Sequence, residues 1–272
     1  SALLPFRFSL SGIGNWLSHW AVTQATWLSW RSEIDHARHA DFGLGPAQLL
    51  DPTLKADSHQ PLTLNAFSEQ VVPRPRDWNE KQVVTGYWRI KEETSERVNE
   101  LVGVQRFIDS AKNPIAIGFG SPGTQGYLSM LEKALNLADA QAVLTLPEKY
   151  HREIKSKNIF PIEYVPHDWL YKRVRVAIHH GGAGTTSASL HAGIPTITMP
   201  LAIDQFFWGE RIQKLGVGLS IPQRKLNAEN LAQAIIEMLN NREMNARAKA
   251  ISKMLNKEEG IQTAVSVIQT IT

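Results

Sequence analysis

The sequence predicts an α/β fold in which the C-terminal part forms a doubly wound, Rossmann-like parallel sheet with helices on both faces. Short apolar runs of β-prone residues alternate with segments of helical periodicity, and repeated β-α units of this kind build parallel sheets. The 272 residues, 43% of them hydrophobic and 20% charged, supply one large domain or two modest ones with an ample core. The expected strands are residues 115–119, 142–146, 160–165, 174–179, 195–199 and 217–221.

Helical periodicity fills most of the gaps between these runs. It is seen in segments 125–137, 185–192 and 205–215. Asn227 is the expected N-cap of the next helix, because its side chain can accept a hydrogen bond from an unpaired N–H group of the first turn. The sequence therefore predicts one nucleotide-binding type of domain over residues 91–272.

Residues 1–90 differ in character from the rest. Residues 71–90 carry two prolines that favour extended backbone, which makes them the best linker candidate. Before them the chain is rich in Trp, Ser and His, and segment 15–38 has the periodicity of a helix. We therefore expect residues 1–90 to form a separate N-terminal part together with its linker.

A stripe of tryptophans runs along the predicted N-terminal helix. At about 100° per residue, the four side chains fall within an arc of about 80°. Aromatic stripes at helical spacing usually pack in a core, but four large aromatics are more than one helix normally needs. They also suit a wide apolar pocket for a bulky acceptor or a surface that contacts a membrane. The residues are Trp16, Trp20, Trp27 and Trp30.

Composition excludes several classes of protein. With no cysteine, the chain has no disulfide, thiolate metal site or cysteine nucleophile, which suits a reducing compartment such as the cytoplasm. The formal charge of +3 comes from 29 Lys and Arg against 26 Asp and Glu, interspersed along the chain, which argues against a nucleic-acid partner. No apolar stretch reaches the roughly 18 residues that a membrane-spanning helix needs.

The loops after the first and fourth predicted strands carry the clearest chemistry, because ligands of open α/β sheets bind outside the carboxyl ends of the strands. After the fourth strand comes the sequence HHGGAGTT, residues 179–186. Its glycines let backbone amides approach a ligand, and the following helix start offers unpaired N–H groups and a positive dipole end. The loop suits a phosphate, with His180 as a donor. A purely structural tight turn is the alternative. No third ligand accompanies the His pair, so no metal site is expected.

The loop after the fifth predicted strand ends in Asp204 and Gln205. A carboxylate accepts hydrogen bonds, and an amide both donates and accepts, so the pair suits the hydroxyl groups of a sugar. The alternative is that Asp204 merely caps the helix that follows.

Five motifs in this order, GFGS, VPHDWL, HHGGAGTT, AGIPT and DQFFW, give the sequence a clear resemblance. It resembles the donor-binding region of the GT-B nucleotide-sugar glycosyltransferases of family 1, and within them the sterol 3-beta-glucosyltransferases. The resemblance covers nearly the whole chain. It implies a GT-B fold with a Rossmann-like C-terminal domain and a Rossmann-like N-terminal acceptor domain, of which residues 1–90 would be only the second part, the first part being absent from this chain.

The resemblance assigns roles to several residues. The segment from Tyr164 to His167 would lie along the uracil ring of a UDP-sugar, with the backbone of Val165 and His167 reading its edge. Asp204 and Gln205 would bind the hexose, and Ala188 stands where plant secondary-metabolite enzymes place a ribose-binding Glu. The residues expected to contact the diphosphate are Ser121, His180, Gly182, Gly184 and Thr185.

The resemblance implies transfer of a hexose, in the first place glucose, from UDP-glucose to a hydroxyl of a hydrophobic acceptor such as a sterol, with inversion and without a metal cofactor. The family's catalytic base would lie in the absent part, so no catalytic residue is assigned. His19, His36 and His39 fit surface or acceptor-pocket positions better than that of a displaced base. Because such acceptors reside in membranes, transient peripheral contact of a cytoplasmic protein with a membrane is a further expectation.

Two alternatives remain open at this point. The chain could be a non-catalytic half-enzyme that binds a UDP-sugar and needs a partner to supply the N-terminal half. It could also be a GT-B UDP-sugar epimerase, although the carboxylates and His that such chemistry requires across the cleft cannot be located in the sequence.

Overall fold

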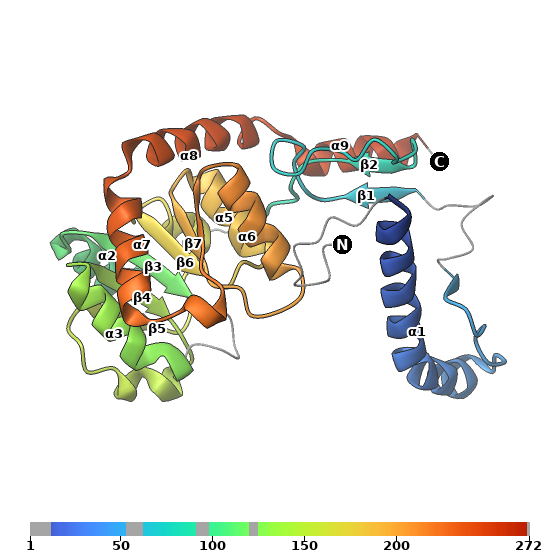
Figure 1. Ribbon diagram of the computed structural model, residues 1–272, viewed down its shortest axis with the longest axis horizontal. Helices are drawn as coiled ribbons and strands as arrows, with labels where there is room; N and C mark the ends of the chain where they lie inside the picture. Colours follow the sequence, from blue (N-terminus) through green and yellow to red (C-terminus); the bar gives the residue numbers. More distant parts are fainter. Residues whose placement is uncertain (1–11, 53–61, 91–97, 120–124, 271–272) are drawn as a thin grey trace. The chain divides into compact units, whose positions relative to one another are not determined.

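The computed structural model describes residues 12–52, 62–90, 98–119 and 125–270 (Figure 1). They fall into two compact units, residues 1–63 and 64–272. The second unit starts at residue 64, so it includes the segment 71–90 that the sequence predicts to be a linker. Two contacts explain why the expected linker lies with the sheet: Ser68 Oγ donates to Glu258 Oε1 at 2.5 Å, and Arg211 Nε donates to the carbonyl oxygen of Val71 at 2.7 Å.

The described part of the first unit is a long helix, α1 (Gly12–Phe42), followed by an extended segment that folds back along it. Side chains of α1 hold the backbone of this segment. Trp27 Nε1 donates to the carbonyl oxygen of Gln48 at 3.1 Å, and Gln24 Nε2 donates to that of Leu49 at 3.1 Å. The prediction of a helix in this region is confirmed.

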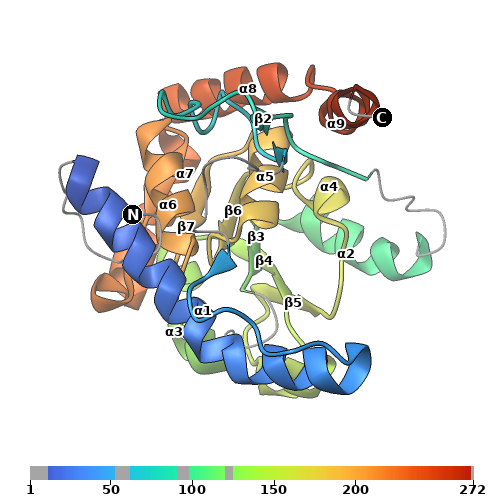
Figure 2. The ribbon, with the colours of Figure 1, turned by 90° about the vertical axis from the view of Figure 1, so that its right-hand side faces the viewer.

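The second unit is built on a parallel sheet of six strands in the order β5-β4-β3-β6-β7-β8 (Figures 1 and 2). The chain therefore starts in the middle of the sheet, moves to one edge, and returns to complete the other half, as in Rossmann folds. All six predicted strands are confirmed. They are β3 (Pro114–Gly118), β4 (Gln141–Thr145), β5 (Ile159–Ile162), β6 (Val176–His179), β7 (Thr196–Thr198) and β8 (Gly218–Ser220).

Helices cover both faces of this sheet because its strands are apolar on both sides. On β3, Ile115 and Ile117 pack in the core against α3 and α7, whereas Ala116 belongs to the core shared with α2 and α4. A third apolar cluster joins α5, α6 and α8. The helices of this unit are α2 (Val98–Ser110), α3 (Leu128–Leu137), α4 (His167–Leu170), α5 (Ala183–Ala192), α6 (Gln205–Lys214), α7 (Ala228–Asn240), α8 (Arg242–Leu255) and α9 (Gly260–Gln269).

Local sequence signals explain several element ends. Asn227 caps α7 as predicted, its side chain accepting from the N–H of Asn230 at 2.7 Å. Gly193 adopts the left-handed conformation that ends α5. Ahead of the large sheet, β1 (Thr63–Asn65) and β2 (Gln82–Val84) form a separate two-stranded sheet.

Candidate functional site

The candidate site lies at the carboxyl ends of β6 and β7, beside the point where the strand order reverses between β3 and β6. Ligands of doubly wound folds bind at such switch points. Here β6 ends at His179 and α5 begins at Ala183, so only the segment 180–182 separates strand from helix. Gly182 is the N-cap of α5, and a glycine has no side chain with which to cap the helix. The first N–H groups of α5, which have no acceptor inside the helix, are thus offered to a ligand.

His180 stands at the centre of this loop. Its ring lies so close to the backbone that a Cβ built on Gly182 would be 2.6 Å from His180 Nε2, so Gly182 is required by close approach. Its Nδ1 is buried and has no hydrogen-bond partner among the described residues. Burial lowers the pKa of His180, with Asp204 acting in the opposite direction. The imidazole is therefore neutral at pH 7 and carries one N–H that can donate to a phosphate oxygen.

The second loop of the site, after β7, touches the first. A Cβ on Gly181 would be 3.0 Å from the carbonyl oxygen of Gln205. The Oε1 atom of Gln205 accepts from the backbone N–H groups of Leu201 at 2.7 Å and Ala202 at 3.1 Å. Because its oxygen is held in this way, the Gln205 amide is fixed in orientation and its NH₂ group is the part that can serve a ligand.

Asp204 stands at the N-cap position of α6 but its side chain makes no cap hydrogen bond. Instead, Oδ2 accepts from the indole Nε1 of Trp208 at 3.1 Å. The alternative interpretation of Asp204 as a simple helix cap is therefore wrong for its side chain. The contact with Trp208, itself buried in the third apolar cluster, holds the carboxylate at the mouth of the sheet.

The remaining predicted diphosphate contacts surround the start of α5. A Cβ on Gly184 would meet no atom of the described residues within 4 Å, so among them this residue faces open space. Thr185 is half-buried, and the hydroxyl of the neighbouring Thr186 is buried without a hydrogen-bond partner among the described residues. Neither threonine caps α5. Ser121 lies outside the described residues.

The predicted uracil contacts lie on the single-turn helix α4 and just before it. Val165 is buried in the core against α2, while Tyr164 and His167 are exposed. His167 is the first residue of α4, and its carbonyl oxygen accepts from the N–H of Tyr171 at 2.8 Å. In the predicted base-binding segment, the buried Val165 thus anchors the backbone, while its neighbours Tyr164 and His167 are exposed to a ligand.

The tryptophan stripe lies on α1, in the first unit. Trp16, Trp20 and Trp30 are 65%, 40% and 61% exposed, and Trp27 is half-buried against Gln48. Within the described residues the stripe does not form a core, contrary to the first interpretation of its spacing. A role in an acceptor pocket stays a prediction. The histidines of the same helix, His19, His36 and His39, are exposed.

Sequence reasoning missed the role of His179. It is fully buried, and its Nδ1 accepts from the N–H of Gly181 at 3.0 Å, which places the ring proton on Nε2. Burial, aided by His180 and His167, lowers the pKa of His179 to about 3. The only signal in the sequence was the pair of adjacent histidines. Adjacent residues of a strand point to opposite faces, but this alternation does not indicate which of the two rings is buried.

This burial predicts an acid-sensitive fold. Between about pH 6.5 and 3 the unfolded state binds a proton at His179 that the folded state does not, so the free energy of unfolding falls as pH falls through this window. From pH 7 to pH 5 the loss from His179 should be about 2 kcal/mol. Urea unfolding of wild type and His179→Asn at both pH values measures it.

The asparagine variant does not titrate, so its loss between the two pH values should be smaller by about that amount. His151→Asn, in the same unit, is the control and should keep the wild-type dependence. Equal pH dependence in wild type and His179→Asn would contradict the assignment.

Neither a metal-binding cluster nor a membrane-spanning helix is present within the described ranges. They hold no group of three or more His, Cys, Asp or Glu side chains arranged for a metal ion. Among the described helices, none is both long and apolar enough to cross a bilayer. A cytoplasmic location and transient contact with a membrane stay predictions.

Comparisons with known proteins show which family the chain is similar to. Residues 129–265 match the family model described as erythromycin biosynthesis protein CIII-like, C-terminal domain. The chain is 34% identical to a sterol 3-beta-glucosyltransferase of Saccharomyces cerevisiae (strain YJM789) over 93% of its own length and 22% of that protein. It is 32% identical to a sterol 3-beta-glucosyltransferase of Arabidopsis thaliana over 92% of its length and 41% of that protein. The chain thus spans about a fifth of the yeast relative and about two fifths of the Arabidopsis relative.

The fold also has a counterpart of known structure. The calicheamicin glycosyltransferase CalG4 superimposes with a TM-score of 0.64 at 13% identity, covering 93% of this chain and 64% of that one. This likeness confirms the GT-B type of α/β fold that the sequence predicts.

Proposed function

The chain belongs to the family of erythromycin biosynthesis protein CIII-like C-terminal domains, and we propose that it binds a UDP-sugar and takes part in hexose transfer. The donor we propose is UDP-glucose, and the acceptor a hydroxyl group of a hydrophobic alcohol such as a sterol. The names of the relatives from yeast and Arabidopsis support this choice of acceptor.

One observation carries the proposal: three kinds of group converge at the carboxyl ends of β6 and β7. They are the uncapped start of α5, the neutral imidazole of His180, and the fixed carboxylate and amide of Asp204 and Gln205. The first two suit a diphosphate and the third suits sugar hydroxyls. The contact between Gly181 and Gln205 sets the two parts side by side, as a sugar diphosphate requires.

The chemistry that we propose is a direct displacement with inversion. The acceptor oxygen forms a bond to the anomeric carbon while the bond from that carbon to the diphosphate oxygen breaks, and UDP leaves with the electron pair. Negative charge grows on the diphosphate as this happens. The N–H groups of α5 and His180 would stabilise that charge in the transition state. The proton of the acceptor must pass to a base, which the described residues do not identify.

The direct test is to incubate the chain with UDP-glucose and a sterol and to measure steryl glucoside and free UDP. Formation of both would support the proposal and exclude the half-enzyme alternative. UDP binding by calorimetry without turnover would support the half-enzyme instead. Absence of UDP binding would overturn the donor assignment.

A substitution at Gly184 tests the position of the diphosphate. Alanine should stabilise α5 by up to about 1 kcal/mol, because the new methyl group meets no atom of the described residues and glycine is a poor helix residue. The same methyl group should obstruct a diphosphate bound at the helix start, so we expect UDP affinity to fall about tenfold. Urea unfolding and calorimetry on Gly184→Ala measure the two effects.

The combination of a more stable protein with weaker binding separates occlusion of the site from damage to the fold. Gly45→Ala is the control, because its Cβ would also meet no atom of the described residues within 4 Å and it lies in the first unit, outside the predicted diphosphate loops. Unchanged UDP affinity in Gly184→Ala would place the diphosphate elsewhere.

A further inference from the structure

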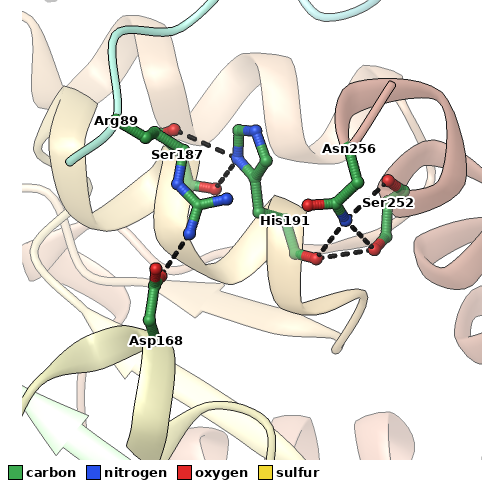
Figure 3. A network of polar contacts seen from close by, with 6 residues as sticks. All are labelled: Arg89, Asp168, Ser187, His191, Ser252 and Asn256. Atoms are coloured by element: carbon green, nitrogen blue, oxygen red, sulfur yellow. Dashed lines mark hydrogen bonds and ion pairs between the residues drawn. The ribbon is translucent and has the colours of Figure 1, made fainter. Parts of the chain in front are cut away.

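An ion pair joins the segment that precedes the sheet to the predicted uracil-binding turn. Arg89 Nη2 donates to Asp168 Oδ1, and the two side chains are 28% and 31% exposed (Figure 3). Asp168 follows His167 directly in α4. The two residues are 79 positions apart in the chain. A charge-assisted hydrogen bond that is shielded in part from water is stronger than a fully exposed surface pair.

The segment that carries Arg89 packs against α5 through Tyr87. The ring of Tyr87, two residues before Arg89, meets that of His191 edge to face, with centroids 5.4 Å apart. His191 is in turn fixed: its Nδ1 lies 2.8 Å from the carbonyl oxygen of Ser187, and its own carbonyl oxygen accepts from Ser252 and Asn256 (Figure 3). Through Tyr87 and His191, the segment that carries Arg89 is therefore connected to α5 and α8 of the second unit.

The turn at the other end of the pair depends on its contacts. With only four residues, α4 has too few hydrogen bonds to be stable alone. Leu170 and Tyr171 anchor it in the core. Arg173 stacks on the ring of Trp169 at 4.2 Å and donates to its carbonyl oxygen. Asp168 adds the tether to a distant segment, so Arg89 fixes the orientation of α4 relative to α5.

We propose that Arg89 and Asp168 are positioning residues for the nucleobase. Their ion pair holds α4 so that the backbone at Val165 and His167 fits the edge of uracil and not that of a purine. The inference rests on the proposed function, because it takes the ligand to be a UDP-sugar. It adds that the choice of uracil over other bases depends on Arg89, which precedes β3 in the chain and lies outside the loops predicted to contact the ligand.

The test compares nucleotides on the whole chain by calorimetry. In Arg89→Ala and in Asp168→Ala, UDP affinity should fall about threefold to tenfold, while affinity for inorganic pyrophosphate stays as in wild type. Affinity for ADP should change little, so the preference for UDP over ADP should fall by the same factor. Arg89→Glu combined with Asp168→Arg restores opposite charges and should recover part of the loss.

Lys112→Ala is the control, since Lys112 and Asp139 form an ion pair in the same unit, with side chains 73% and 66% exposed. This pair precedes β3 and β4, at the amino ends of the strands, whereas the site lies at the carboxyl ends. The control variant should leave all three affinities unchanged. Equal weakening of UDP and pyrophosphate in the Arg89 and Asp168 variants would mean general damage and would overturn the inference, as would wild-type UDP affinity. If wild type itself bound no UDP, the proposed function would fail instead, before any variant was compared.

Discussion

Replacing His180 with alanine should lower the rate of sugar transfer about a hundredfold or more and weaken UDP binding. Removing one donor that stabilises charge in a transition state commonly costs two to three powers of ten in rate, or about 3 to 4 kcal/mol. His180 qualifies as such a donor because its ring is neutral, lies against the backbone of Gly182, and stands beside the uncapped start of α5. Its buried Nδ1 has no partner among the described residues, so the ring is not used for an internal hydrogen bond there.

The measurement is the initial rate of UDP release with UDP-glucose and a sterol, together with UDP affinity by calorimetry. His180→Gln keeps an N–H donor on a side chain of similar reach and should recover part of the rate. His151→Ala, whose ring contacts the carbonyl oxygen of Leu146 just after β4, two strands away from β6, should behave as wild type. If His180→Ala kept its rate and affinity, the donor site would have to be placed elsewhere.

The sheet and its loops could be predicted because their signals are local. Each strand is a short apolar run, and the register places Gly118, His179 and Thr198 side by side, so the loops that follow them open at one edge. The N-cap at Asn227 depends on a residue three positions away. The HHGGAGTT segment combines the end of a strand, a close approach and a helix start within eight residues. Signals that involve only a few neighbouring residues can be recognised in a single sequence.

Contacts between distant segments could not be predicted in the same way. Nothing in the pattern around Arg89 indicates Asp168, and the linker signals at two prolines gave no sign that Val71 accepts from Arg211. Helical spacing put the tryptophans on one face but could not say whether that face is covered. Motif content likewise suggested that Gln205 meets a sugar, but not that its oxygen is already held by backbone N–H groups.

Alanine at Gly181 should damage both the fold and the site, in contrast to alanine at Gly184. Gly181 has φ +92°, a conformation that costs an L-residue about 1 to 2 kcal/mol. Its Cβ would also be 3.0 Å from the carbonyl oxygen of Gln205, a backbone atom that cannot swing away. We expect the free energy of unfolding to fall by about 1 to 3 kcal/mol and UDP-glucose affinity to fall tenfold or more, roughly 1.4 kcal/mol.

The two losses have different origins, and the pair of glycine variants separates them. Strain at Gly181 acts on the loop in the free protein, so urea unfolding without ligand detects it. The new methyl group of Gly181→Ala should displace Gln205 and so increase the distance between the predicted hexose site and the diphosphate site. This variant should therefore lose more affinity for UDP-glucose than for UDP. Gly184→Ala, which leaves both loops in place, should weaken the two ligands by the same factor. An equal loss for both ligands in Gly181→Ala would mean that the loop after β7 does not hold the sugar.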